Sequence, residues 1–406
     1  MVYMPNILGP WVAPPQARPR LRRLAASPAS RRERRGAPQV LRVVGVIVDS
    51  EGAVPGEVRI GPSGEILERG SRGTLGPERS GERKLHGIVL PLAVNGHTHV
   101  GDSVWTKEPP KLPFHQVVAP PHGLKHRLLA QTSPREKRQG MRASLSAMAA
   151  LGTAVTLDFR EEAAPGVRLL RAAEKGAGIE AIALGRPADP LDRREVRALL
   201  QEADGLGLSA LRDLPLGAAE LARQEVRRAG KRLALHASES VWESLDPVLD
   251  LKPDLLVHLC QATGEDLDAV RDAKVAVAAC PRSNALYGRF PPLAQIERRG
   301  IPLLLGTDNV MFQAPDLFRE MEFAYLSSRA RGEPLEPRTL VDAVFVTPWK
   351  ILGRPAAARL EAGAPSRALV LRLPTEDPYY QVAARSAHRH LLVPGRSAVG
   401  GAVPVA

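Results

Sequence analysis

From Gly87 onward, short apolar runs alternate with longer stretches of helical periodicity. Most of these runs are continuously apolar, which is typical of parallel strands buried on both faces. Eight strands, each followed by a helix, over about 250 residues predict an α/β fold, a (β/α)8 TIM barrel at residues 88–360. The expected strands are Ile88–Gly96, Thr153–Phe159, Ile179–Gly185, Gly207–Leu211, Arg232–His236, Leu255–Leu259, Ala273–Cys280 and Ile301–Thr307.

Further β-rich segments flank the predicted barrel on both sides. Leu41–Ser50 and Glu57–Gly70 precede it, the second with a turn at Pro62-Ser63-Gly64, and 367–373 and 391–393 follow it. We therefore expect residues 41–87 and 361–400 to form one small composite β domain built from both chain ends.

The basic character of the chain is concentrated at its start. Residues 1–40 hold eight arginines and one acid, Glu33, so they carry +7 of the formal net charge of +12. This stretch shows no hydrophobic period and cannot bury enough apolar surface to offset the entropy of ordering, so we expect a disordered tail. Three other roles stay open: an anion- or nucleic-acid-binding arm, a transit peptide, and residues upstream of a mis-called start.

Composition narrows the location and the partners. The sequence has no run of 18 apolar residues, which excludes a helical membrane span. Two cysteines, Cys260 and Cys280, cannot make a disulfide scaffold, so a reducing, cytoplasmic location is expected. We expect a small-molecule substrate and neither a membrane nor a nucleic-acid partner. The sequence leaves assembly into a homo-oligomer open.

Active sites of such barrels lie at the C-terminal ends of the strands, and histidines gather there. His97 and His99 end the first strand, His236 the fifth and His258 the sixth, while Asp308 follows the eighth. Residues i and i+2 of a strand share a face about 6–7 Å apart, so the first two can bind one metal ion. Each residue alone has an ordinary structural explanation, but four of the chain's ten histidines at one rim predict a metal site.

The order His-x-His, His-x-x-Glu, His, Asp resembles that of the amidohydrolase superfamily, in particular its cytosine deaminase/chlorohydrolase-like branch. The resemblance extends over most of the chain, from about residue 41 to 396. Cys280-Pro281-Arg282-Ser283-Asn284 is similar to the PxSN segment of that branch, and Thr347–Gly353 to its terminal helix. Gly363–Val370 departs from the family pattern, away from the predicted site.

The resemblance implies a role for each residue of the predicted site. His97, His99, His236 and Asp308 correspond to ligands of one divalent metal ion, Zn2+ or alternatively Fe2+. Such an ion lowers the pKa of its bound water to about 7 and so supplies a hydroxide nucleophile. Three residues then take catalytic roles: Glu239 shuttles the proton, His258 hydrogen-bonds the water or the substrate, and Asp308 accepts a hydrogen bond from the hydroxide.

The predicted strand-4 region, residues 208–213, lacks the lysine that two-metal members of the superfamily carboxylate. This favours a mononuclear site and hydrolytic deamination of an aminated heterocycle or related amine through a metal-bound hydroxide. The chain is thus expected to hydrolyse carbon–nitrogen bonds other than peptide bonds. The alternatives are hydrolysis of another C–N or C–Cl bond by the same site, and a catalytically inactive scaffold barrel.

Substrate contacts are the least constrained part of the prediction. Arg160, just past the second strand, would suit a carboxylate or phosphate, or form a salt bridge with Glu161 or Glu162. Trp105 and Phe312 could stack on a planar ring or pack in the core. Asn284 is a further candidate contact. The proline-rich stretch 106–126 is interpreted as a lid over the barrel mouth or as a rigid surface connection.

Overall fold

The computed structural model describes residues 40–108, 111–118, 123–386 and 391–392. The basic stretch 1–39, on which the expected tail falls, lies outside the described residues. Among the described helices, none combines the length and the apolar character that crossing a membrane requires.

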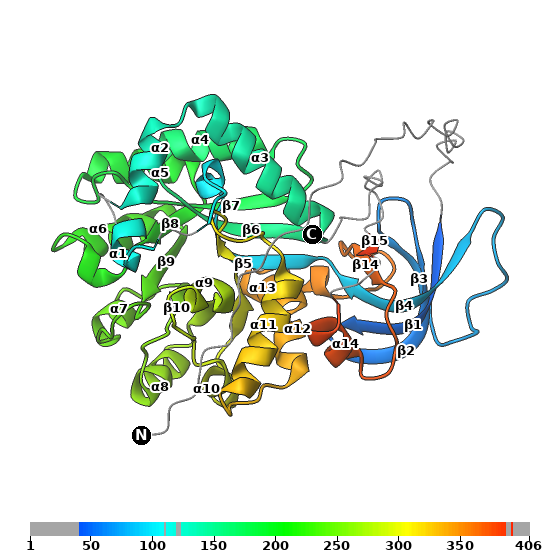
Figure 1. Cartoon of the computed structure of the whole chain (residues 1–406). Helices are drawn as coiled ribbons and strands as arrows, with labels where there is room; N and C mark the ends of the chain where they lie inside the picture. Colours follow the sequence, from blue (N-terminus) through cyan, green and yellow to red (C-terminus); the bar gives the residue numbers. More distant parts are fainter. Residues whose placement is uncertain (1–39, 109–110, 119–122, 387–390, 393–406) are drawn as a thin grey trace, which may run out of the picture. The chain divides into compact units, whose positions relative to one another are not determined.

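The chain ends build a mixed six-stranded sheet (Figure 1). Its order is β15-β14-β4-β1-β2-β3, and only the β1–β4 pairing is parallel. Strands from both sides of the barrel sequence therefore share one sheet, as expected for a composite β domain. The strands are β1 (Leu41–Asp49), β2 (Gly52–Ile60), β3 (Ile66–Gly70), β4 (Arg83–Pro91), β14 (Ala368–Leu371) and β15 (Leu391–Leu392).

The second sheet is the predicted barrel, and all its pairings are parallel. Two short strands, β12 and β13, make up its eighth segment: β12 pairs with β11 and β13 with β5, which closes the sheet. The strands are β5 (Ala93–His99), β6 (Thr153–Arg160), β7 (Glu180–Gly185), β8 (Gly205–Leu208), β9 (Arg232–Ala237), β10 (Leu255–His258), β11 (Ala276–Ala279), β12 (Leu303–Leu305) and β13 (Asp308–Asn309).

Helices connect successive barrel strands (Figure 1). The long helix α3 (Pro134–Ala150) has Ser133 as its N-cap. The Ser133 side chain accepts a hydrogen bond from the Glu136 backbone, and the Glu136 carboxylate accepts one from the Ser133 backbone, which is a capping box. The others are α4 (Ala163–Glu174), α5 (Arg193–Glu202), α6 (Ala218–Ala229), α7 (Asp246–Asp250), α8 (Gly264–Asp272), α9 (Pro281–Ala285), α10 (Leu293–Arg298), α11 (Leu317–Ala330), α12 (Pro337–Phe345), α13 (Thr347–Ile351) and α14 (Pro378–Ala384).

One sequence expectation about a single element is wrong in detail. The apolar run expected as one strand at Ile88–Gly96 contains a change of sheet. Its first part belongs to β4, which pairs with β14, and after Leu92 the chain continues as β5, which pairs with β6. A continuous apolar run carries no mark of such a switch, because both halves are buried. The proline-rich stretch 106–126 includes helix α1 (Phe114–Val118) and the start of α2 (Leu124–Gln131).

Candidate metal centre

Three imidazoles converge at the C-terminal ends of β5 and β9. The ligand atoms of His97, His99 and His236 all lie within 4.8 Å of one another. Nε2 of His99 is 3.4 Å from Nε2 of His236. Oδ1 of Asp308 joins them from β13, at 3.3 Å from His97 Nε2 and 3.7 Å from His99 Nε2. Four donors from β5, β9 and β13, which are far apart in the sequence, thus lie close together.

The hydrogen bonds of two of these imidazoles fix which nitrogen is free. His236 Nδ1 donates to the carbonyl of Leu208 at 2.8 Å. His99 Nδ1 lies 3.0 Å from Oε1 of Glu161 and donates to it. In both rings the proton is held on Nδ1, so Nε2 presents a lone pair to the cluster, as metal-binding histidines usually do.

Burial keeps the donors in the protonation states that a cation needs. Burial lowers the pKa of His97 and of His236, and burial together with the Lys125 ammonium lowers that of His99 to about 3. Burial also opposes ionisation of Asp308, but the surrounding imidazoles, His97 first, outweigh it and lower its pKa well below the usual range. The set is three neutral imidazoles and one carboxylate, which are metal-binding forms.

His97 Nε2 faces the Asp308 carboxylate without a hydrogen bond to it, so the His97 ring tests whether the residues present fit a cation. Both its ring nitrogens are buried, and neither has a hydrogen-bond partner among the described residues. A buried polar group without a partner costs about 1–3 kcal/mol. A cation coordinated by Nε2 would remove that cost at one of the two atoms. The residues present therefore fit a single divalent metal ion.

Asp308 is aimed at the cluster by its surroundings. Its Oδ2 accepts a hydrogen bond from Ser283 Oγ at 2.5 Å, which leaves Oδ1 facing the histidines. The Asp308 backbone has a φ of 57°, in the left-handed region that non-glycine residues rarely adopt. His258, at the end of β10, has a φ of 79°. Such backbone strain is concentrated at functional sites.

A pair of hydrogen bonds joins β5 to the segment between β12 and β13 and positions the donors relative to one another. Asn95 Nδ2 donates to Thr307 Oγ1 at 2.8 Å, and its Oδ1 accepts from the Thr307 backbone at 3.1 Å. Gly306 must be glycine here, since a Cβ would stand 2.6 Å from Cβ of His97. Asn95 was not predicted from the sequence, although its i−2 spacing from His97 places it on the same strand face.

His258 has a ligand atom within 4.8 Å of those of His97 and Asp308, and it forms a second group with Glu239 beside the donors. Nε2 of His258 lies 3.5 Å from Oε2 of Glu239. Asn284 Nδ2 donates to both, at 3.2 Å to His258 Nδ1 and 3.4 Å to Glu239 Oε1. Because Nδ1 of His258 accepts this bond, its proton sits on Nε2, toward Glu239. Burial raises the pKa of Glu239 above its usual value.

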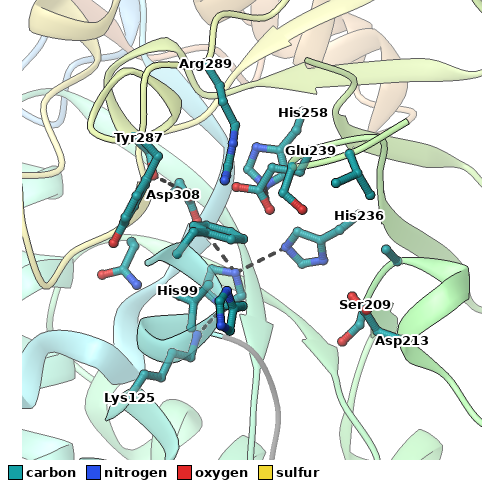
Figure 2. Close-up of a pocket in the computed structure, with 18 of the residues that line it drawn as sticks. His99, Lys125, Ser209, Asp213, His236, Glu239, His258, Tyr287, Arg289 and Asp308 are labelled. Carbon is teal, nitrogen blue, oxygen red and sulfur yellow. Dashed lines mark hydrogen bonds and ion pairs between the residues drawn. The ribbon is translucent and has the colours of Figure 1, made fainter. Parts of the chain in front are cut away.

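The donors line a cavity of about 420 Å³ at the C-terminal ends of the strands (Figure 2). This volume suits a small organic ligand. His99, His236, Glu239, His258 and Asp308 line it, whereas His97 lies behind them, fully buried. Part of the wall comes from the proline-rich stretch and the helices within it, through Phe114, His115, Val118 and Lys125.

A buried charge cluster adjoins the metal donors. Lys125 Nζ lies 2.9 Å from Oδ2 of Asp102 and 2.6 Å from Oε1 of Glu161. His99, Asp102 and Glu161 also have ligand atoms close enough for a cation, but the ammonium of Lys125 already occupies that role. Lys125 has no periodic or motif signal in the sequence, whereas Glu161 directly follows barrel strand β6 and could have been found from that position.

Of the residues predicted as substrate contacts, some line the cavity and others do not. Arg160 does not reach the cavity: it is fully buried and paired with Asp158 and Glu161, so the salt-bridge alternative is the one formed. Trp105 is not among the cavity-lining residues either, and Lys107 Nζ lies 5.0 Å from its ring. Phe312 lines the cavity. Asn284 contacts Glu239 and His258 instead of the open space.

Comparison with known proteins identifies relatives in sequence and in fold. The model of the amidohydrolase family matches residues 88–388. A protein of Methanothermobacter thermautotrophicus named "Putative aminohydrolase" is 33% identical over 353 residues, which cover 80% of this chain and 91% of that protein. The 5-methylthioadenosine/S-adenosylhomocysteine deaminase of Caldanaerobacter subterraneus is 31% identical over 124 residues, 26% of this chain and 29% of that protein.

Among solved structures, an adenosine deaminase from Xanthomonas campestris with bound zinc matches with a TM-score of 0.70 at 18% identity. The match covers 89% of this chain and 93% of that one. At this identity the likeness concerns the fold, and it extends over the barrel and the composite sheet alike. With the family model spanning the whole barrel, the chain belongs to the amidohydrolase family.

Proposed function

We propose that the chain is a metal-dependent deaminase that hydrolyses the C–N bond of an aminated heterocycle or a related amine. The observation that carries the proposal is the donor set of three neutral imidazoles and Asp308, of which His99, His236 and Asp308 line a cavity that Glu239 also lines. Further support comes from the relatives, since a curated relative and a solved structural neighbour are deaminases.

His97, His99, His236 and Asp308 would hold the metal ion, and zinc is the proposed ion because the structural neighbour binds it. When bound, a divalent cation lowers the pKa of water and so supplies a nucleophile at neutral pH. One metal ion is proposed, because the adjacent acidic pocket is neutralised by Lys125.

Glu239 is the proposed proton carrier. Its carboxylate faces the cavity and takes a proton from the attacking water as the C–O bond forms. It returns that proton to the nitrogen, which leaves as ammonia when the C–N bond breaks. Burial raises its pKa, which brings the group closer to the operating pH, where a proton carrier is most efficient.

His258 and Asp308 are proposed to orient the reacting groups. The Nε2 proton of His258 points toward Glu239, and His258 lines the cavity, so this proton can be donated to a ring atom of the substrate. Oδ1 of Asp308 can accept a hydrogen bond from the attacking water. Proper orientation and proton transfer each contribute to the rate, the latter about 10²–10⁴-fold.

The test is a screen of purines, pyrimidines and related amines for ammonia release by the metal-loaded enzyme. We expect at least one substrate, and we expect Glu239→Gln to lower kcat on it by about 10²–10⁴-fold with unchanged metal content. If the metal-loaded protein releases no ammonia from any amine, deamination is wrong, and hydrolysis of another bond or a scaffold role takes its place.

A further inference from the structure

The cavity contains an arginine that neither the metal donors nor the proton carrier explains. Arg289 follows α9 and lines the cavity. Figure 2 shows its side chain reaching down between Tyr287 and Glu239. Its guanidinium lies 4.3 Å from the centre of the Phe114 ring and 5.7 Å from that of Tyr287. Phe114 and Tyr287 meet edge-to-face at 5.0 Å and together hold it.

The hydrogen-bonding edge of this guanidinium is left open. Stacking on an aromatic ring uses the face of the group and leaves its N–H bonds free. Arg289 is half-buried, but its Nη1 is buried and has no hydrogen-bond partner among the described residues, and no described carboxylate lies within 4.0 Å of its nitrogens. A buried cationic donor without an acceptor is costly unless a ligand supplies one.

The other cations of the cavity wall are already satisfied in part or in full. Lys125 is paired with two carboxylates. Arg212 donates to the Val241 carbonyl at 3.1 Å and to Ser240 Oγ at 3.0 Å. Arg186 has the Glu161 carboxylate at 3.9 Å, although its buried Nε has no hydrogen-bond partner among the described residues. Arg289 therefore stands out among the described cavity residues as a cation held in place without an acid.

We infer that the substrate carries an acidic group, a carboxylate or a phosphate, and that Arg289 binds it. The inference rests on the proposed function, whose substrate class it narrows. Carboxylate and phosphate share the planar pair of acceptor oxygens that a guanidinium edge matches. Arg289 enters from the segment after β11, on the same side of the cavity as Glu239 (Figure 2), so the acidic group would lie beside the reacting carbon's proton carrier. Arg289 is then a specificity residue.

The first experiment measures anion binding without turnover. Isothermal titration of the metal-loaded full chain uses two probes, inorganic phosphate and benzoate, which separate the two sources of the acidic group. We expect wild type to bind at least one of them, and Arg289→Gln to weaken that anion by about 10–100-fold, the value of a charged hydrogen bond. Arg289→Lys should keep part of the affinity because it keeps the charge.

The matched control is Arg298→Gln, which removes an exposed arginine from the neighbouring helix α10, outside the cavity. It should bind both probes like wild type. Equal binding by wild type and Arg289→Gln overturns the inference, as does the absence of binding of both anions to wild type. An equal loss in Arg298→Gln would also overturn it, because the effect would then follow net charge.

The second experiment separates this inference from the proposed deamination. For amines that release ammonia, kcat/KM is compared between acid-bearing substrates and neutral ones of the same ring. Arg289→Gln should lower it about 10–100-fold for the acid-bearing members alone, through KM. An equal loss of kcat for all substrates would mean that Arg289 acts through the proton carrier Glu239, and it would overturn the recognition of an acidic group. Anion binding that depends on Arg289, without ammonia release, would sink deamination and keep the anion site.

Discussion

Two buried clusters lie side by side at the barrel mouth and differ in how their charges are satisfied. In the metal-donor cluster (His97, His99, His236 and Asp308), lone pairs face one another and His97 has no hydrogen-bond partner among the described residues. In the Lys125 cluster (Asp102, Lys125, Asp158, Arg160 and Glu161), cations and carboxylates are paired. The metal-donor cluster therefore suits a cation bound from solution, whereas the Lys125 cluster contains the cations that neutralise its carboxylates.

Glu161 connects the two clusters. One oxygen accepts from His99 and from Lys125, and the other from Arg160. The paired cations lower the pKa of Glu161 well below its usual value, although burial opposes this. The Lys125 cluster thereby keeps a carboxylate ionised behind a metal-donor imidazole, which fixes the tautomer of His99.

Removing the ammonium of the Lys125 cluster should have the largest effect on the protein. Lys125→Ala leaves the Asp102 and Glu161 carboxylates buried without their ammonium, so we expect the free energy of unfolding to fall by about 3–5 kcal/mol. Denaturant unfolding at neutral pH checks this. Arg168→Ala is the control, since Arg168 and its partner Glu202 are both exposed and its loss should cost about 1 kcal/mol or less. Equal losses in the two variants would mean that the Lys125 cluster is not distinct.

Breaking the link between the clusters should affect metal binding. Glu161→Gln removes the charged acceptor of the His99 Nδ1 proton, and we expect metal affinity to fall about 10–100-fold, as for other carboxylates behind metal-bound histidines. Competition with a chromophoric chelator measures this. Glu162→Gln changes the next residue, which pairs with Lys137 and not with His99, and should leave affinity unchanged. Unchanged affinity in Glu161→Gln would show that the link has no role.

The smallest effect concerns pH. Metal ions compete with protons for histidines, and an ordinary histidine has a pKa of about 6.5. The pKa values of His97, His99 and His236 are lowered, that of His99 to about 3, so these rings stay neutral on mild acidification. We expect zinc affinity to change less than about threefold between pH 7 and 5.5. A fall of about tenfold per pH unit would indicate ordinary histidines.

The sequence was sufficient to predict the barrel and the place where the donors meet. The reason is geometric: all strands of a parallel barrel end at one rim, so residues at strand ends converge however far apart they are in sequence. The family resemblance is confirmed by the match over residues 88–388. The assigned roles of the individual ligands, of Glu239 and of His258 stay predictions, although the structure brings these side chains together.

The site residues that the sequence did not predict depend on contacts between distant parts of the fold. Lys125 belongs to a proline-rich stretch without a period, and only the fold shows that its ammonium enters a pocket of carboxylates. Arg160 looked free to reach the mouth, but its carboxylate neighbours hold it in the interior. Arg289 became visible only through the absence of a partner, which no sequence pattern reports.

The central claim is that one cluster takes up a metal ion and its neighbour does not. The direct measurement is the metal content of purified wild type beside His97→Ala, His236→Ala and Asp308→Ala. We predict about one equivalent of zinc or iron per chain in wild type, as for a single closed set of ligands, and its loss in each variant. Two equivalents, or no metal after growth in metal-supplemented medium, would contradict the account.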